Sequence, residues 1–398
     1  MDSLNRLIAG HRFKPRYIVP VAAAILLTFG RTGMLPFLGR LTILDHLMNI
    51  FVVVVAPVLS LIALFRRQAG YNIPLLVPIL LLGAWLSIVI LLMSPRELWP
   101  SRTALITIAL ALILCSQIAV EELHHVRHGV LLLTALFGVC TLLFGRATIG
   151  YILSGSLLGM RLGAEHSASA IIAFPRIMYV LVLTCIATIV IDKKGWIRIV
   201  AALSIPIPLL IAFSAGARGP LLALVVALIT FVLGLKKKIE VIVSFIVLGL
   251  FTVLGYNFFL NYFPLRDSRL LRDNRSGVWE WALSYDISIV GQGITPRYPH
   301  NIFLEFLVNY GLVGLTLFLV VLTITVVTVS KAYARTGNKE VLWVVCLLVL
   351  QMTAQQFSLS IYFAGPLWAA MVMPLGLIQN RTIVGVVHRS KSVGAPAP

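Results

Sequence analysis

Charged residues are scarce in this chain, and acidic residues are the scarcest of them. Of 398 residues only 12% are Asp, Glu, Lys or Arg, which is about half the share of a typical soluble domain. Only 14 are acidic, against 32 Lys and Arg, so the formal net charge is +18. Hydrophobic residues make up 60% of the chain. This balance excludes a soluble globular enzyme and a disordered chain, because disordered segments are poor in apolar residues.

Cysteine is also rare, and its positions suggest no covalent framework. All four cysteines lie inside apolar runs, without the spacing of a zinc site. This excludes a small secreted protein held together by disulfides. We expect each cysteine to pack as a small hydrophobic residue. They are Cys115, Cys140, Cys185 and Cys346.

Long apolar runs are abundant instead. The hydrophobic residues, about 240 of them, suffice for about twelve membrane-spanning helices of roughly 20 residues each. We therefore predict an all-α polytopic membrane protein that forms a single domain over residues 1–398, with kinks at the prolines inside several runs. The predicted spans are 17–30, 43–64, 73–94, 103–120, 129–145, 170–191, 197–214, 220–235, 239–257, 302–329, 341–358 and 360–379.

The distribution of basic residues predicts the orientation of these spans. Most Lys and Arg would lie on the side that holds both termini, including Lys193 and Lys194, so we predict that both termini are cytoplasmic. The first apolar run follows basic residues, but no small-residue cleavage site comes promptly after it, and we expect an uncleaved first span. No soluble basic domain is present, so we expect no nucleic-acid partner despite the net charge.

The longest predicted connection, residues 258–301 between the ninth and tenth spans, lies on the opposite side and is rich in arginine. Long connections in compact proteins are often functional, and the planar guanidinium group suits phosphate oxygens. The alternative is a solvated loop in which Asp267 and Asp273 neutralise some of the charge. The arginines of this connection are Arg266, Arg269, Arg272, Arg275 and Arg297.

Further arginines are expected near the same face. Arg218 follows a small-residue turn and opens the next apolar run, where the free N–H groups of a helix N-terminus also favour an anion. Arg161 lies in the connection before the sixth span, and Arg176 lies inside that span. Such residues are costly near a membrane unless they are paired or functional. For Arg218 the alternative is an interfacial residue that extends to water.

His300 follows Pro299 where the long connection re-enters the membrane, and Asn301 comes next. A histidine has a near-neutral pKa and can accept a proton from a hydroxyl nucleophile, although a structural role is the alternative. We expect Trp279 and Trp281 to lie at the membrane interface, and stacking of Trp279 on a sugar is the other possibility.

The outer connections contain no closely spaced pair of carboxylates. A divalent cation at a phosphate site usually requires such paired oxygen ligands. We therefore predict phosphate binding by arginine, with no metal and no cofactor. One cluster has metal-like spacing but falls in a predicted cytoplasmic turn, far from the arginines, and we expect it to be a solvated helix end. Its residues are Glu121, Glu122, His124, His125 and His128.

The order and spacing of these residues resemble the O-antigen ligase and O-antigen polymerase family. The resemblance covers residues 210–320 by motif and the whole chain by number of spans. The turn from Ser214 to Arg218 is similar to the family's upstream motif. The remaining pattern is Arg275-x3-Trp279-x2-Ala282-Leu283, Gly291-x-Gly293, His300-Asn301-x2-Leu304-Glu305 and Gly311-x2-Gly314.

The resemblance implies a GT-C-like glycosyltransferase at the periplasmic face of a bacterial inner membrane. Its donor would be a glycan on undecaprenyl diphosphate, and its acceptor would be lipid A–core for a ligase or a second lipid-linked glycan for a polymerase. Arg218 and Arg275 would hold the diphosphate and His300 would activate or position the acceptor. Arg161 fits the pattern less closely. Further candidate contacts to substrate are Arg266, Arg269, Arg272, Arg297, Trp279 and Asn301.

The connection 258–301 is the longest of this chain but is rather short for a ligase of this family, which leaves the choice between ligase and polymerase open. We favour a ligase of lipopolysaccharide assembly. The alternative from another class is a transporter or flippase for a lipid-linked anion. Such a protein would more naturally place paired ionisable residues at the membrane midplane and show internal repeat symmetry. The sequence indicates neither feature, so it favours the enzyme.

Overall fold

The computed structural model shows a helical protein. Of the residues it describes, 87% are helical and none lies in a strand, which agrees with the predicted all-α class. The described residues are 18–29, 58, 73–93, 109, 111–112, 115–116, 118–144, 168–214, 218–235, 275–293, 299, 301–356 and 364–376.

Most of the helices coincide with the apolar runs of the sequence. The predicted runs 43–64 and 239–257, and most of 103–120, lie outside the described residues. The elements are α2 (Ile18–Phe29), α5 (Ile73–Met93), η3 (Val120–Glu122), α7 (Leu123–Phe144), α10 (Ala168–Ile191), α11 (Gly195–Ser204), α12 (Pro206–Ser214), α13 (Arg218–Gly234), α16 (Arg275–Leu283), α17 (Ile302–Thr336), α18 (Lys339–Gln355) and α19 (Gly365–Val372).

Two of these helices are long and apolar enough to cross a membrane. Within the described part of the chain they are Leu76–Met93 of α5 and Ile302–Thr336, the whole of α17. The end of α5 exposes large aliphatic side chains, with Leu92 78% exposed. An apolar surface of this kind is stable against lipid and costly against water. The structure therefore supports a membrane protein at the level of these two helices.

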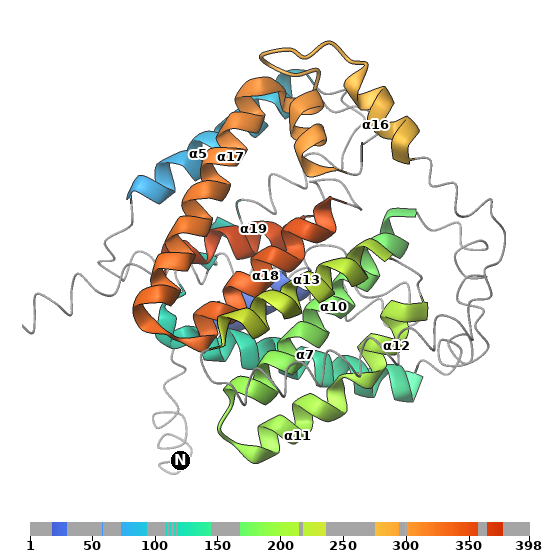
Figure 1. The fold of residues 1–398 in the computed structure, drawn as a ribbon, viewed down its shortest axis with the longest axis vertical. Helices are drawn as coiled ribbons and strands as arrows, with labels where there is room; N and C mark the ends of the chain where they lie inside the picture. The colour runs from blue at the N-terminus through green and yellow to red at the C-terminus, as the bar shows by residue number, and fades with distance from the viewer. Residues whose placement is uncertain are drawn as a thin grey trace, which may run out of the picture.

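Helix α10 forms the centre of the main helical bundle. It packs against α7, α11, α12, α13 and α18, and Figure 1 shows it between α7 and the pair formed by α13 and α18. Its residues from Ile177 to Leu183 are all buried, because the helix is apolar around its whole circumference. A buried indole ties it to α18, since Trp343 Nε1 donates to Thr184 Oγ1 at 3.3 Å.

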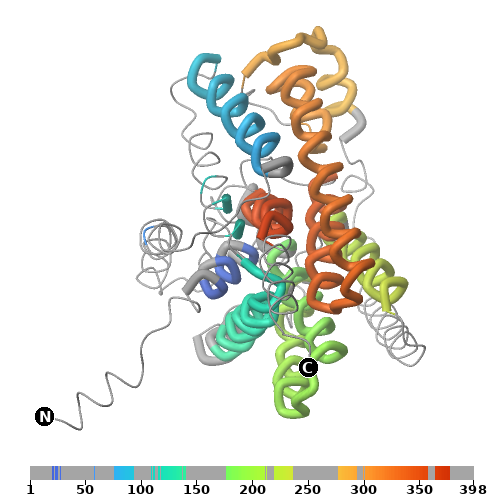
Figure 2. The backbone as a smooth tube through the Cα atoms, turned by 90° about the vertical axis from the view of Figure 1, so that its left-hand side faces the viewer, coloured from blue at the N-terminus to red at the C-terminus, as the bar shows by residue number. Residues whose placement is uncertain are grey.

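Helices α5 and α17 form a second layer that extends away from this bundle. Helix α5 packs against α17, and α16 contacts α17 as well. Figures 1 and 2 show α5 beside the first half of α17, while the second half of α17 reaches back to α18. Residues 288–293, which follow α16, form backbone hydrogen bonds with residues 308–313 of α17.

The run 197–214 is divided into two helices at its first proline. Helix α11 ends at Ser204 and α12 begins at Pro206, because proline has no N–H group to continue the helical hydrogen bonds. This confirms the kink expected in that run. Three of the four cysteines are described with their side chains, and Cys115, Cys185 and Cys346 are all buried thiols, as the sequence predicts.

Candidate functional site

Two of the predicted phosphate-binding arginines lie at the starts of helices. Arg275 is the first residue of α16 and Arg218 is the first residue of α13. Pro220 lies in the first turn of α13, where its missing N–H removes no hydrogen bond. The first turns of both helices leave backbone N–H groups without intrahelical partners, and these groups favour an anion. The described backbone thus agrees with the expected position of Arg218, whereas the helix that begins at Arg275 was not expected within the connection 258–301.

The other predicted site residues fall into two groups. The side chains of Arg218 and Arg275 lie outside the described residues, and so do Arg161, Arg266, Arg269, Arg272, Arg297 and His300 entirely. Trp279 and Asn301 are described with their side chains. The structure therefore describes the predicted site by the side chains of Trp279 and Asn301 and by the backbone around them.

Trp279 connects α16 to the residues that precede α17. Its indole Nε1–H donates to the carbonyl oxygen of Pro299 at 3.0 Å. Trp279 is half-buried and Pro299 is buried. Since Trp279 lies one helical turn after Arg275, the hydrogen bond links the helix of Arg275 to the backbone directly before His300.

Asn301 fixes the start of α17. It has an extended backbone, and its Oδ1 accepts from the N–H groups of Phe303 at 3.0 Å and Leu304 at 3.2 Å. This is the N-cap that the residue type favours, because the amide oxygen satisfies N–H groups that the helix leaves free. Glu305 follows in the first turn and is fully buried. Asn301 thus has a structural task in addition to its predicted role in substrate binding.

Helix α17 is broken at Gly311, about two and a half turns after it begins. Gly311 has φ +69° and ψ −171°, which no helix contains. The break leaves backbone groups on both sides without their helical partners, and the segment after α16 supplies new ones. Gln292 N–H donates to Val308 O, Gly293 N–H to Asn309 O, Leu312 N–H to Ser288 O and Val313 N–H to Ile289 O, all at 3.0 to 3.2 Å.

The glycine motifs of the sequence meet at this crossing. A Cβ on Gly291 would lie 2.4 Å from Asn309 O, and a Cβ on Gly311 would lie 2.4 Å from Gly291 N. Gly291 and Gly293 both have positive φ, +92° and +76°. Trp85 of α5 binds one more backbone group beside the break, since its Nε1–H donates to Tyr310 O at 3.0 Å. The glycines thus permit two backbones to cross where a non-helical break needs partners.

Replacing Gly291 with alanine is expected to detach this crossing. The positive φ alone costs about 1–3 kcal/mol for a residue with a Cβ, and the collision with the backbone of Asn309 adds to it. The thermal midpoint of the purified protein in detergent should fall by several degrees or more. Gly83→Ala is the matched control, because a Cβ at Gly83 in α5 meets nothing within 4 Å. An unchanged midpoint for Gly291→Ala would contradict the crossing.

Arg176 is buried in the middle of the bundle. Its side chain is 2% exposed, and Nε donates to Oε1 of Gln351 on α18 at 2.5 Å. Gln351 is 1% exposed, and its Nε2 has no hydrogen-bond partner among the described residues. The sequence predicts Arg176 inside a span, and the structure shows that the amide oxygen that accepts from it belongs to a different helix. This contact links the first half of α10 to the second half of α18.

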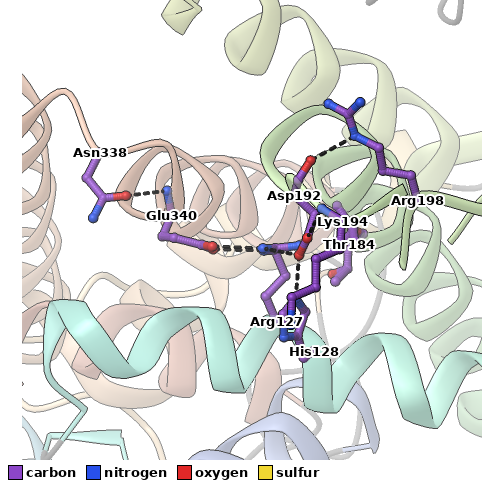
Figure 3. Close-up of polar contacts among 9 residues, drawn as sticks. Arg127, His128, Thr184, Asp192, Lys194, Arg198, Asn338 and Glu340 are labelled. Carbon is purple, nitrogen blue, oxygen red and sulfur yellow. Dashed lines mark hydrogen bonds and ion pairs between the residues drawn. The ribbon is translucent and has the colours of Figure 1, made fainter. Parts of the chain in front are cut away.

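A second polar network joins three helix ends at the predicted cytoplasmic side. Arg127 of α7 is 2% exposed and binds Glu340 of α18 with two hydrogen bonds of 2.8 Å. The same guanidinium group lies 3.4 Å from Asp192 Oδ2 at the end of α10. Figure 3 shows Arg127 between the two carboxylates. Because its charge is matched by two acidic groups, this arginine ties helices together and offers no free charge to a substrate.

Asp192 is held by groups from several elements. His128 Nε2 lies 2.6 Å from its Oδ2 and the Lys194 N–H donates to its Oδ1 at 3.0 Å, while Arg198 Nε donates to its backbone oxygen (Figure 3). Burial raises the pKa of this carboxyl, but the hydrogen bonds from Lys194 and His128 and the charges of His128 and Arg127 lower it by more. The pKa of Asp192 is therefore below its ordinary value.

The cluster with metal-like spacing belongs to the same region. Among the described residues no group of three His, Cys, Asp or Glu side chains is arranged to hold a metal ion. Glu122 is buried and accepts from the Ala119 N–H at 3.1 Å, and His128 binds Asp192. Burial lowers the pKa of His125, and the charges of His124 and His128 lower it further. The charge of Glu122 raises this pKa by less, so the pKa of His125 is below its ordinary value. Glu121 is exposed, as expected of a solvated helix end, whereas the three histidines are half-buried and Glu122 is buried.

Comparisons with known proteins give no family. No protein-family model matches the sequence, and no curated protein matches it.

Proposed function

We propose that the chain is an integral membrane glycosyltransferase that acts as an O-antigen ligase. It would transfer a glycan from undecaprenyl diphosphate to lipid A–core at the periplasmic face of a bacterial inner membrane, without a metal. The proposal includes about twelve spans in a GT-C-like arrangement, with both termini cytoplasmic. It rests on the sequence resemblance and on the backbone geometry of the motifs that carry it.

One observation supports the proposal more than any other. The hydrogen bond from Trp279 to Pro299 joins the helix that begins at Arg275 to the residues beside His300. These are the two motifs that the resemblance assigns to the donor and to the acceptor. A glycosyl transfer requires them to lie together, because the leaving diphosphate and the incoming hydroxyl meet at one carbon.

The chemistry follows from the donor. The acceptor hydroxyl oxygen forms a bond to the anomeric carbon while the bond from that carbon to the diphosphate oxygen breaks. Negative charge develops on the departing diphosphate, and Arg218 and Arg275 would stabilise it. The hydroxyl proton would pass to His300, which returns it to solvent after release of the products. The N-terminus of the helix that each arginine begins would add positive potential beside that arginine.

The orientation of this arrangement can be tested by labelling. In a variant whose own cysteines are replaced by serine, Ser284→Cys after α16 should react with a membrane-impermeant maleimide in intact spheroplasts. Lys194→Cys in the turn before α11 should react only after the membranes are opened. Both side chains are exposed, so access to the reagent decides the result. The reverse pattern would contradict the proposed orientation.

The activity is tested with purified protein in nanodiscs. Undecaprenyl-diphosphate-linked glycan and lipid A–core are added with EDTA, and the products are separated by gel and identified by mass. Glycan on lipid A–core, lost in His300→Ala, is the expected result. Product that appears only after a divalent metal is added would contradict the metal-independent mechanism.

The two alternatives predict different products in the same experiment. A polymerase would give a ladder of longer glycans that remain on undecaprenyl diphosphate, because it uses the same donor with another acceptor. A transporter or flippase would move the lipid-linked donor between leaflets and form no glycosidic bond. Either result would replace the ligase proposal.

A further inference from the structure

The indole N–H of Trp279 is already used inside the protein. A tryptophan side chain has a single hydrogen-bond donor, and that of Trp279 binds the carbonyl oxygen of Pro299. It is therefore not available to a sugar hydroxyl. The ring is half-buried, so only part of it remains for stacking. These contacts favour a structural task at the site over a direct contact to the glycan.

The bonded carbonyl belongs to a residue with little freedom. Pro299 has no N–H group and a fixed φ, so its carbonyl is the only hydrogen-bonding group of its backbone. Pro299 is buried, and a buried carbonyl without a partner would be costly. The bond from Trp279 therefore both satisfies this oxygen and fixes the peptide that leads into residue 300.

The residue on the other side of position 300 is fixed as well. Asn301 caps α17 through two hydrogen bonds from its own first turn. His300 is joined covalently to Pro299 and to Asn301, and its own placement lies outside the described residues. Two anchors on different elements, α16 and α17, thus hold the residues on either side of position 300.

The anchor on α16 also lies close to Arg275 along the helix. Positions four apart on an α-helix share one face, so Trp279 and Arg275 lie on the same side of α16. Residues 288–293, which follow α16, are held on α17 by backbone hydrogen bonds at the break near Gly311. Helix α16 is therefore tied towards α17 twice, by these bonds and by the bond from Trp279 to Pro299.

We infer that Trp279 is a positioning residue of the transfer reaction, whose indole N–H holds the peptide before His300 at a set distance from Arg275. The inference rests on the proposed glycosyltransferase function. Loss of the N–H would leave donor and acceptor binding in place but let the acceptor-activating group move. A displacement of about 1 Å at a reacting group costs roughly a hundredfold in rate.

The test compares Trp279→Phe with Trp281→Phe in nanodiscs. Trp281 lies on the same helix and packs edge-on against Tyr285, with ring centroids 4.9 Å apart, a contact that phenylalanine retains. We expect kcat of Trp279→Phe to fall roughly tenfold to a hundredfold, with KM for both substrates within about twofold. The acid limb of its kcat–pH profile should shift, whereas Trp281→Phe should keep the wild-type profile.

A second variant removes only the N–H. Trp279 replaced by 3-benzothienylalanine keeps the shape of the ring and puts sulfur in place of the nitrogen, and it should reproduce the loss in kcat. This covers the case in which Trp279→Phe folds poorly. A raised KM with unchanged kcat would identify a sugar-stacking platform and overturn the inference, and so would variants that match Trp281→Phe. A wild-type protein that forms no glycosidic bond would instead refute the proposed function itself.

Discussion

Arg275→Ala is expected to abolish glycan transfer while the amount of folded protein stays unchanged. The diphosphate gains negative charge as the sugar leaves, and a planar guanidinium group can bind two of its oxygens. Removing a single such group from a charge-stabilising site typically costs 10²–10³-fold in rate, and an arginine on a transferring phosphoryl group costs more. We therefore expect at least about a thousandfold loss in kcat.

The fold should tolerate this substitution because of where Arg275 lies. It is the first residue of α16, and alanine is the best helix former. The anchors of α16, from Trp279 to Pro299 and from residues 288–293 to the break in α17, involve other residues. Size-exclusion profiles and thermal midpoints should match those of the wild type.

Two further variants sharpen the interpretation. Arg275→Lys keeps the charge but loses the two-pronged geometry, so its rate should lie between those of the wild type and Arg275→Ala. Arg335→Ala is the matched control, because Arg335 lies exposed in the last turn of α17, far along the chain from the site. Full transfer activity in Arg275→Ala would remove Arg275 from the site.

The helices were the predictable part of this protein. Apolar runs bounded by charge or proline gave α5, α10, α13 and α18 within a few residues of their ends, because a helix buried among helices or in lipid must be apolar throughout. The start of α13 at Arg218 was also predictable, since it follows a small-residue turn. Helix α16 was not predicted, because it lies inside the connection 258–301 and is too short to form a separate apolar run. The charge pattern predicts an orientation that the described residues leave to the labelling experiment.

The contacts between elements were not predictable in the same way. The run 302–329 has the composition of an uninterrupted helix, yet α17 is broken at Gly311. Glycine within a helix is common, so its presence alone does not indicate a break. The break is stable only because residues 288–293 satisfy the freed backbone groups, and that partner is distant in sequence. Likewise, nothing in the local sequence pairs Arg127 with Glu340, which lie on helices α7 and α18.

Removing Arg127 from its buried network should destabilise the protein strongly. Arg127→Met would leave the carboxylates of Glu340 and Asp192 buried beside an apolar side chain. Removing one partner of a buried ion pair costs about 3–5 kcal/mol. The thermal midpoint of the protein in detergent should fall steeply, whereas Arg335→Met, at an exposed position, should leave it unchanged.

A double variant separates the loss of a pair from the loss of packing. Arg127→Met combined with Glu340→Leu removes both buried charges that share two hydrogen bonds, and it should recover most of the lost stability. Asp192 keeps its hydrogen bonds to His128 and to the Lys194 N–H in this background. No recovery in the double variant would contradict the pairing with Glu340 as the source of the lost stability.

The same network predicts how stability responds to acid. The pKa of Asp192 is lowered in the folded protein, so its ionised form stabilises the fold at any pH above the ordinary carboxyl pKa. This contribution is lost as the pH falls through the lowered pKa, because the unfolded chain then takes up the proton first. At about pH 5 the wild type should therefore be more stable than Asp192→Asn, because the carboxylate is ionised in both the folded and the unfolded chain. Below about pH 4 the difference should shrink, and a difference that grows in acid would contradict this role of Asp192.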